Sequence, residues 1–135
     1  MKKQIASNEY FSVFVDESKN RVYATFNGFW SQMKIMDDYR ACLPAVFKMM
    51  KSKFTLVADL RNFKTLPPDL VPKQKQSMMD FAQAGVFKIA LILPSSAISG
   101  MQVKQSAAET KNMPERQFDN VAEAEKWLDS VVANL

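Results

Sequence analysis

Residues 54–59 read Phe-Thr-Leu-Val-Ala-Asp, and residues 87–93 read Phe-Lys-Ile-Ala-Leu-Ile-Leu. Both runs are almost continuously apolar, which is typical of strands that are covered on both faces. Between them, the spacing of apolar residues predicts a helix over about 70–84, with Gly85 as its C-cap. Because a strand, a helix and a second strand follow one another with short connections, the two strands are expected to be parallel.

The residues before this unit predict a β-hairpin and a long helix. Residues 11–15 form a β-rich run, and residues 21–26 alternate after a polar turn. Ser31 is a candidate N-cap for a helix that runs to about Met50 with one apolar stripe. Pro44 lies inside this stripe, where it is expected to kink or restart the helix because proline lacks an N–H.

The residues after the unit predict further helices and one short strand. A weaker helix is expected after Pro94, running towards Lys111, and residues 115–118 are expected to form an edge strand. Asn120 begins a capping-box pattern, and the apolar stripe that follows predicts a helix over 121–135.

Together these elements predict an α/β protein with a single mixed, mostly parallel five-stranded sheet. We expect an N-terminal β-hairpin, right-handed βαβ crossovers and about four helices in one domain over residues 1–135. If each later strand pairs with its predecessor, every crossover helix lies on the same face of the sheet. The opposite face is still partly apolar, so it needs cover from the hairpin, a terminal helix, a second subunit or an apolar ligand.

The composition disfavours most catalytic chemistries. The chain has 135 residues, of which 47% are apolar and 24% are charged, and it has no histidine. Histidine is the commonest metal ligand and the commonest general base at neutral pH, so most zinc, haem and serine-histidine chemistry lacks a required part. We therefore expect no metal, no cofactor and no catalysis.

The charge and the targeting signals point to a cytoplasmic protein without a nucleic-acid partner. The 18 basic and 14 acidic residues give a net charge of +4, but four of the basic residues are Arg and the rest are Lys. Recognition of nucleic-acid bases depends mainly on Arg, and no run of basic residues is as long as the basic arms that bind nucleic acid. No apolar run approaches the roughly 18 residues of a membrane span, and polar residues interrupt any signal-peptide core. Cys42 stands alone, which predicts a small buried side chain without a disulfide.

Three stretches and the element order resemble the SpoIIAA-like proteins of the STAS superfamily (sulfate transporter and anti-sigma factor antagonist), which is also compared with lipid-binding CRAL-TRIO modules. The stretches are Phe-Asn-Gly-Phe-Trp at 26–30, Val-Ala-Asp-Leu-Arg-Asn-Phe at 57–63, and Phe-Asp-Asn-Val-Ala-Glu-Ala-Glu-Lys-Trp-Leu at 118–128. The likeness covers nearly the whole chain. It implies a noncatalytic module that docks to protein or small apolar partners.

The sequence departs from this resemblance at one functional position. In the anti-sigma antagonist branch, the family implies a phosphorylated serine at the start of the helix that follows the strand ending here at Asp59. Leu60, Arg61 and Asn62 follow instead, and the next hydroxyl belongs to Thr65, which is the candidate phosphoacceptor. The phosphorylation switch is therefore not carried over.

Five residues near the carboxyl ends of the strands are the candidate partner-binding residues, because ligands of α/β folds usually lie at that edge of the sheet. They are Asn27, Phe29, Trp30, Asp59 and Arg61. A strand-end carboxylate beside a guanidinium can grip a partner's charged group. The alternative is that the charged pair bonds neighbouring loops and that the two aromatic residues cover the core.

Ser95 and Ser96 form a second candidate site, because hydroxyls and free amides at a helix N-terminus suit a phosphate or carboxylate. Helix capping explains the same residues equally well. A third interpretation, a histidine-free hydrolase or transferase using Ser96 or Asp59, would require a wet cleft with a perturbed carboxylate or lysine.

These observations predict a noncatalytic regulatory or scaffolding module that binds a protein partner and self-associates, with a homodimer as the simplest form. The alternative function is a carrier of a small apolar ligand or lipid, held between the sheet and the helices among methionine and phenylalanine side chains. A co-purifying acyl-chain mass would distinguish the carrier.

Overall fold

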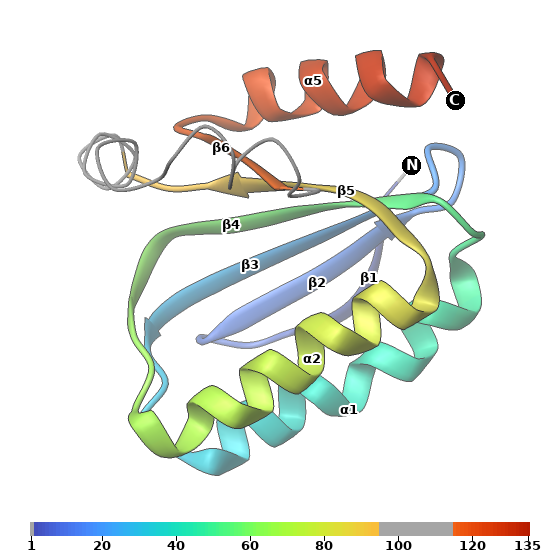
Figure 1. Ribbon diagram of the computed structural model, residues 1–135. Coiled ribbons are helices and arrows are strands. Elements are labelled where there is room, and N and C mark those ends of the chain that lie inside the picture. The colour runs from blue at the N-terminus through green and yellow to red at the C-terminus, as the bar shows by residue number, and fades with distance from the viewer. Residues whose placement is uncertain (1, 95–114) are drawn as a thin grey trace.

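The computed structural model describes residues 2–94 and 115–135, which form a six-stranded sheet with helices on both of its faces (Figure 1). The strands are β1 (Lys2–Ser7), β2 (Phe11–Asp16), β3 (Arg21–Phe29), β4 (Phe54–Thr65), β5 (Val86–Ile92) and β6 (Glu115–Phe118). The helices are α1 (Met33–Met49), the 3-10 turn η1 (Pro68–Leu70), α2 (Val71–Ala84) and α5 (Val121–Ala133).

The strands lie in the order of the sequence, from β1 to β6. The pairs β1/β2 and β2/β3 are antiparallel, and the three later pairs are parallel. This arrangement confirms the α/β class, the hairpin, and the pairing of each strand with its predecessor.

The expected five strands and four helices are not matched. The sheet has a sixth strand, β1, at its edge, where it pairs with β2 through a register shift between Gln4 and Ala6. Most of its residues are exposed and polar, so the segment carries little of the apolar alternation that marks a strand. Three α-helices lie within the described residues, and the helix predicted after Pro94 falls outside them.

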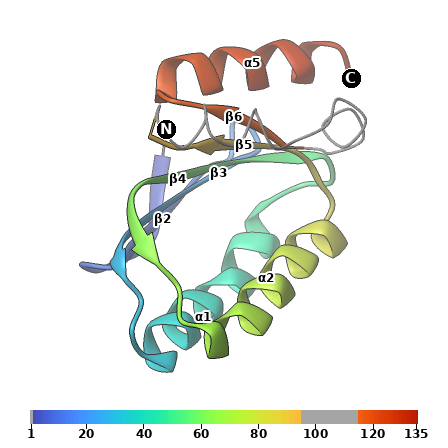
Figure 2. The ribbon, with the colours of Figure 1, turned by 60° about the vertical axis from the view of Figure 1, so that its left-hand side comes forward.

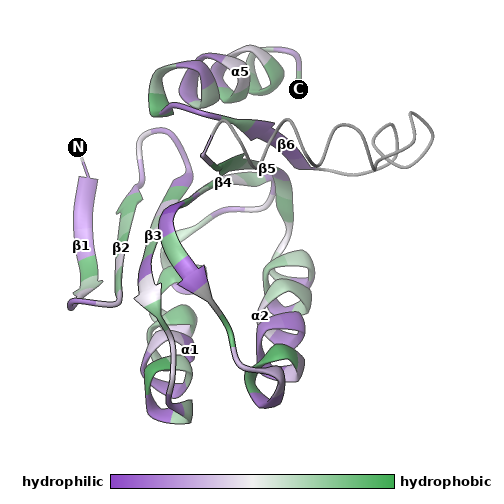
Figure 3. Cartoon of the chain, turned by 90° about the vertical axis from the view of Figure 1, so that its left-hand side faces the viewer, coloured by the Kyte–Doolittle hydropathy of each residue, from purple (hydrophilic) through white to green (hydrophobic). Residues whose placement is uncertain are grey.

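Two helices cover one face of the sheet, which we call the α1/α2 face (Figure 2). The main core lies beneath them and includes Phe11, Val22, Leu56, Met36 and Phe81, which are all buried. Apolar and polar residues alternate around each helix, so that one side of each helix can pack on the sheet while the other meets water (Figure 3).

The helix ends follow the predicted chemistry in two of three cases. Gly85 ends α2 with φ 101°, a left-handed conformation that favours glycine. Asn120 caps α5, because its side-chain oxygen accepts a hydrogen bond from the Glu123 backbone N–H at 2.8 Å. The predicted cap at Ser31 is wrong: Gln32 occupies the N-cap of α1 and makes no side-chain cap bond. Of the kink or restart expected at Pro44, the restart does not occur, since α1 continues through this residue as one helix.

The opposite face, which we call the α5 face, is covered in part by α5 (Figure 1). Ala124 and Leu128 of α5 are fully buried and share a second core with the sheet residues Tyr23, Val57 and Ala90. Of the expected kinds of cover for this face, the structure shows the terminal helix.

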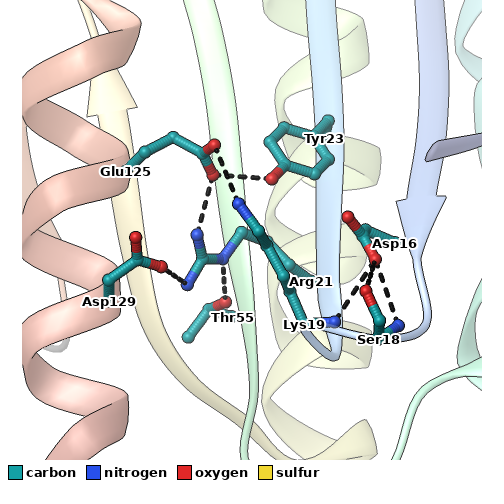
Figure 4. A network of polar contacts seen from close by, with 8 residues as sticks. All are labelled: Asp16, Ser18, Lys19, Arg21, Tyr23, Thr55, Glu125 and Asp129. Carbon is teal, nitrogen blue, oxygen red and sulfur yellow. Dashed lines mark hydrogen bonds and ion pairs between the residues drawn. The ribbon is translucent and has the colours of Figure 1, made fainter. Parts of the chain in front are cut away.

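A buried arginine ties α5 to the sheet (Figure 4). The Arg21 side chain is 1% exposed, and its Nε donates a hydrogen bond to Thr55 Oγ1 at 2.9 Å. Its Nη1 lies 2.7 Å from Glu125 Oε1, and its Nη2 lies 3.0 Å from Asp129 Oδ1. The Tyr23 hydroxyl donates to the same Glu125 oxygen at 2.6 Å. Two strands and one helix therefore meet at a single guanidinium, a set of contacts that we call the Arg21 clamp.

The contacts of the clamp change the pKa values of Tyr23 and Glu125. Burial, and then the hydrogen bond to Glu125, raise the pKa of Tyr23 above its usual value. Burial alone would raise the pKa of Glu125, but the hydrogen bonds from Tyr23 and Arg21 outweigh it and lower that pKa. Glu125 is therefore ionised at neutral pH and balances the buried positive charge.

We predict that removing the carboxylates of the Arg21 clamp lowers the free energy of unfolding more than removing Arg21 itself. The double variant Glu125→Gln with Asp129→Asn leaves the Arg21 charge buried without a counter-charge, and should lower the free energy of unfolding by about 3 kcal/mol. Arg21→Met should cost less, because Glu125 and Asp129 are 23% and 60% exposed and can be hydrated. Urea denaturation measures both losses.

Glu123→Gln is the matched control, since Glu123 lies in the first turn of α5 on its exposed side. It should change the free energy of unfolding by less than about 0.5 kcal/mol. A larger loss for Arg21→Met than for the double variant would contradict the prediction.

Candidate functional site

The end of β4 differs from the rest of the sheet because it carries a bulge. Thr25 on β3 pairs with Asp59, but Asn27 pairs with Asn62, so β4 has one more residue than β3 between these pairs. A bulge of this kind bends its strand. In Figure 2, β4 curves at this end towards the start of α2. We call this curved end of β3 and β4, with the loop before α2, the β4 tip.

The bulge also interrupts the alternation of side chains. Leu60 and Phe63 lie three positions apart, yet both pack against the core of the α1/α2 face. β4 runs on to Thr65, beyond the predicted end at Asp59. Its pairing with β5 stops at Asp59, so within the described residues the last six residues of β4 pair with β3 alone.

A narrow apolar slot lies at the β4 tip. It has a volume of about 110 Å³ and is lined by Phe26, Trp30, Leu60, Phe63, Leu66 and Gln74. Because five of these six residues are apolar, the slot suits an uncharged, apolar group.

Aromatic contacts hold the wall of the slot rigidly. The Trp30 ring lies 5.9 Å from Phe63, 5.3 Å from Phe26 and 5.7 Å from Tyr39, measured between ring centroids. The indole N–H of Trp30 donates a hydrogen bond to the Tyr10 carbonyl at 3.2 Å. Tilted aromatic contacts of this kind stabilise by about 0.5 to 1.5 kcal/mol each. The slot is therefore preformed in the folded chain.

The structure gives the five predicted partner-binding residues three different placements. Trp30 is 1% exposed, so its side chain belongs to the core, as the alternative interpretation has it, and forms the inner wall of the slot. Phe29 ends β3 and is 46% exposed. Asn27, Asp59 and Arg61 lie beside one another where β3 and β4 pair around the bulge.

Asp59 and Arg61 form a close ion pair on β4. Arg61 Nε lies 3.0 Å from Asp59 Oδ1, and Arg61 Nη2 lies 2.7 Å from Asp59 Oδ2. The Arg61 backbone N–H donates to the same carboxylate at 3.1 Å. Burial alone would raise the pKa of Asp59, but these hydrogen bonds outweigh it and lower that pKa.

The structure adds little evidence on the other predicted sites. Thr65 is the last residue of β4, whereas the family resemblance places its phosphorylated serine at a helix start. Ser95 and Ser96 lie outside the described residues. Burial raises the pKa of the Cys42 thiol to about 11, so this cysteine is protonated at neutral pH.

The described residues contain neither a group of side chains suited to a metal ion nor a membrane-spanning helix. Within residues 2–94 and 115–135, no three His, Cys, Asp or Glu side chains are grouped so that they could hold a metal ion. None of the helices in this part of the chain is both long enough and apolar enough to cross a membrane.

The slot was missed from the sequence because its lining comes from separate segments. Leu60 and Phe63 are three positions apart, a spacing that in a regular strand predicts opposite faces. Nothing in the sequence places Gln74 of α2 opposite them. The bulge that brings these residues together has no glycine or proline to mark it.

We predict an acid-dependent contribution from the Asp59–Arg61 pair. Because the folded state lowers the pKa of Asp59, the ionised carboxylate stabilises the fold above its ordinary pKa, and this stabilisation is lost as the pH falls through the folded-state value. Asp59→Asn should therefore be less stable than the wild type at about pH 7, and the difference should vanish at about pH 2. Urea denaturation across this range measures it.

Asp38→Asn serves as the control, since Asp38 is an exposed helix residue. An Asp59→Asn deficit that stays constant down to about pH 2 would contradict the assigned role of the carboxylate.

The chain was compared with protein-family models, curated proteins and solved structures, and none of the three comparisons gives a match. The likeness to SpoIIAA-like proteins therefore remains a prediction from the sequence.

Proposed function

We propose that this protein is a noncatalytic regulatory or scaffolding module that binds a protein partner at the β4 tip. The observation that carries the proposal is the preformed apolar slot between β4 and α2. Binding energy at protein interfaces concentrates in a few large side chains that enter well-packed pockets. A slot with aromatic walls is a pocket of this kind, which a large side chain of the partner can enter.

The size of the slot supports a single side chain as its occupant. An apolar cavity of about 150 Å³ holds one benzene ring, so a slot of about 110 Å³ suits a leucine, methionine or similar side chain. Burial of such a side chain contributes about 1.5 to 3 kcal/mol. We therefore propose that the partner inserts one aliphatic side chain here.

Two residues of the β4 tip that do not line the slot itself can add contacts to a partner docked there. Phe29 offers an exposed aromatic ring at the end of β3. Arg61 is 41% exposed and held in place by Asp59, so a partner's acidic group can meet a fixed guanidinium. The absence of histidine from the chain supports a role without catalysis. The SpoIIAA-like resemblance, the homodimer and the cytoplasmic location remain predictions beside this proposal.

The alternative function, a carrier of a small apolar ligand or lipid, has less support from the slot. Pockets for small molecules usually measure about 300 to 1,000 Å³. The slot is about a third of the lower limit, so it does not suit an acyl chain.

Gln74→Trp tests the proposal, because Gln74 lies on α2 at the slot and a larger side chain there should block entry. We expect proteins captured specifically by the wild type from native cell extract to bind this variant at least about 30-fold more weakly, the loss typical of one hot-spot contact. Quantitative mass spectrometry of the captured fraction, followed by titration of the purified partner, measures the loss.

Met79→Ala is the matched control, since Met79 also lies on α2 and is 54% exposed. It should capture the same partner as the wild type. A partner that binds wild type, Gln74→Trp and Met79→Ala equally would refute docking at the slot.

A further inference from the structure

A second hollow lies on the α5 face, beside α5. It has a volume of about 300 Å³, and its lining includes Ser12, Phe14, Thr25, Asp59 and Val121. This volume is at the lower end of the range for small-molecule pockets, about 300 to 1,000 Å³. We call it the α5-side groove.

Strand register places three polar side chains of the groove in one row. Ser12 on β2 pairs with Thr25 on β3, and Thr25 pairs with Asp59 on β4. Paired residues on neighbouring strands project to the same face, and the strands lie about 4.7 to 4.9 Å apart. The row therefore presents two hydroxyls and a carboxylate over about 10 Å.

The two hydroxyls of this row are free to bind a ligand. Within the described part of the chain, neither Ser12 nor Thr25 makes a side-chain hydrogen bond, although both residues are half-buried. Two fully buried hydroxyls elsewhere are bonded: Thr55 accepts from Arg21, and Ser77 donates to the Lys73 carbonyl. The groove thus holds hydrogen-bonding capacity that the fold itself does not use.

The charge in the row is already balanced. Two Arg61 nitrogens lie 3.0 and 2.7 Å from the Asp59 oxygens, which neutralises the carboxylate without using all of its acceptor positions. The other charge at the groove is the Lys2 ammonium, which lies 3.9 Å from the centre of the Tyr23 ring. A ligand of this row therefore needs hydroxyl groups more than it needs a charge.

From these observations we infer that the α5-side groove binds a neutral, hydroxyl-rich small molecule of about the size of a monosaccharide. Its hydroxyls would exchange hydrogen bonds with Ser12, Thr25 and Asp59, and its apolar face would lie on the Phe14 ring. Hydroxyl groups suit this row because each can donate to the carboxylate and also accept from serine or threonine.

The α5-side groove and the slot have no lining residue in common, although Asp59 of the groove also holds Arg61 at the β4 tip. The groove is formed on the α5 face, whereas the slot residues pack against the core of the α1/α2 face. Gln74→Trp, which blocks the slot, should leave binding in the groove unchanged, so the two proposals fail separately.

The test uses the full chain labelled with ¹⁵N and titrated with D-glucose, D-ribose and myo-inositol. A small polar ligand in an open groove is expected to bind with a Kd on the order of millimolar. At least one of the three should shift the amide signals of Ser12, Thr25 and Asp59 in a saturable way. If none does, the inference is wrong. If sodium acetate shifts these signals and the three neutral compounds do not, the groove is an anion site and the inference is equally overturned.

Two variants test the role of the row. Thr25→Val removes the hydroxyl but keeps the shape and suits a strand, and Ser12→Ala removes the neighbouring hydroxyl. Each should weaken binding of the responding compound by about tenfold. Ser7→Ala, at an exposed position of β1, should bind like the wild type. Unchanged affinity in both Thr25→Val and Ser12→Ala would overturn the inference.

Discussion

The buried guanidinium of Arg21 determines how α5 packs on the sheet. A charge that is 1% exposed requires counter-charges, and α5 supplies them as Glu125 and Asp129. The same contacts fix where α5 lies across the sheet, with Leu128 over the apolar strip. The α5-side groove is the part of this face that α5, held in that position, leaves open. One ion-pair network therefore determines which part of the α5 face is covered by α5 and leaves the α5-side groove accessible.

The sequence predicted the regular part of the fold well, because that part follows from short-range patterns. The apolar runs of β4 and β5, the stripe of α1, and the caps at Gly85 and Asn120 all appear at their expected positions. β1 was missed because its polar residues hide the alternation, and the N-cap position of α1 is Gln32, without a side-chain cap bond, and not Ser31. Such errors arise where tertiary pairing overrides local preference.

The candidate sites were harder to predict because each depends on register between distant segments. Asp59 and Arg61 were expected to act together, and they do form a close pair. Trp30 lies in the core, where its ring contacts Phe26, Tyr39 and Phe63 from three separate elements. The row of Ser12, Thr25 and Asp59 depends on two strand registers, which single-sequence patterns do not specify.

The outer border of the sheet at β1 limits how two copies of this chain could join. Exposed lysines and an irregular register are devices that discourage one sheet from adding strands to another. β1 has both, with Lys2 and Lys3 at its start and a shift between Gln4 and Ala6. A symmetric pair formed by fusing two sheets at this border is therefore disfavoured.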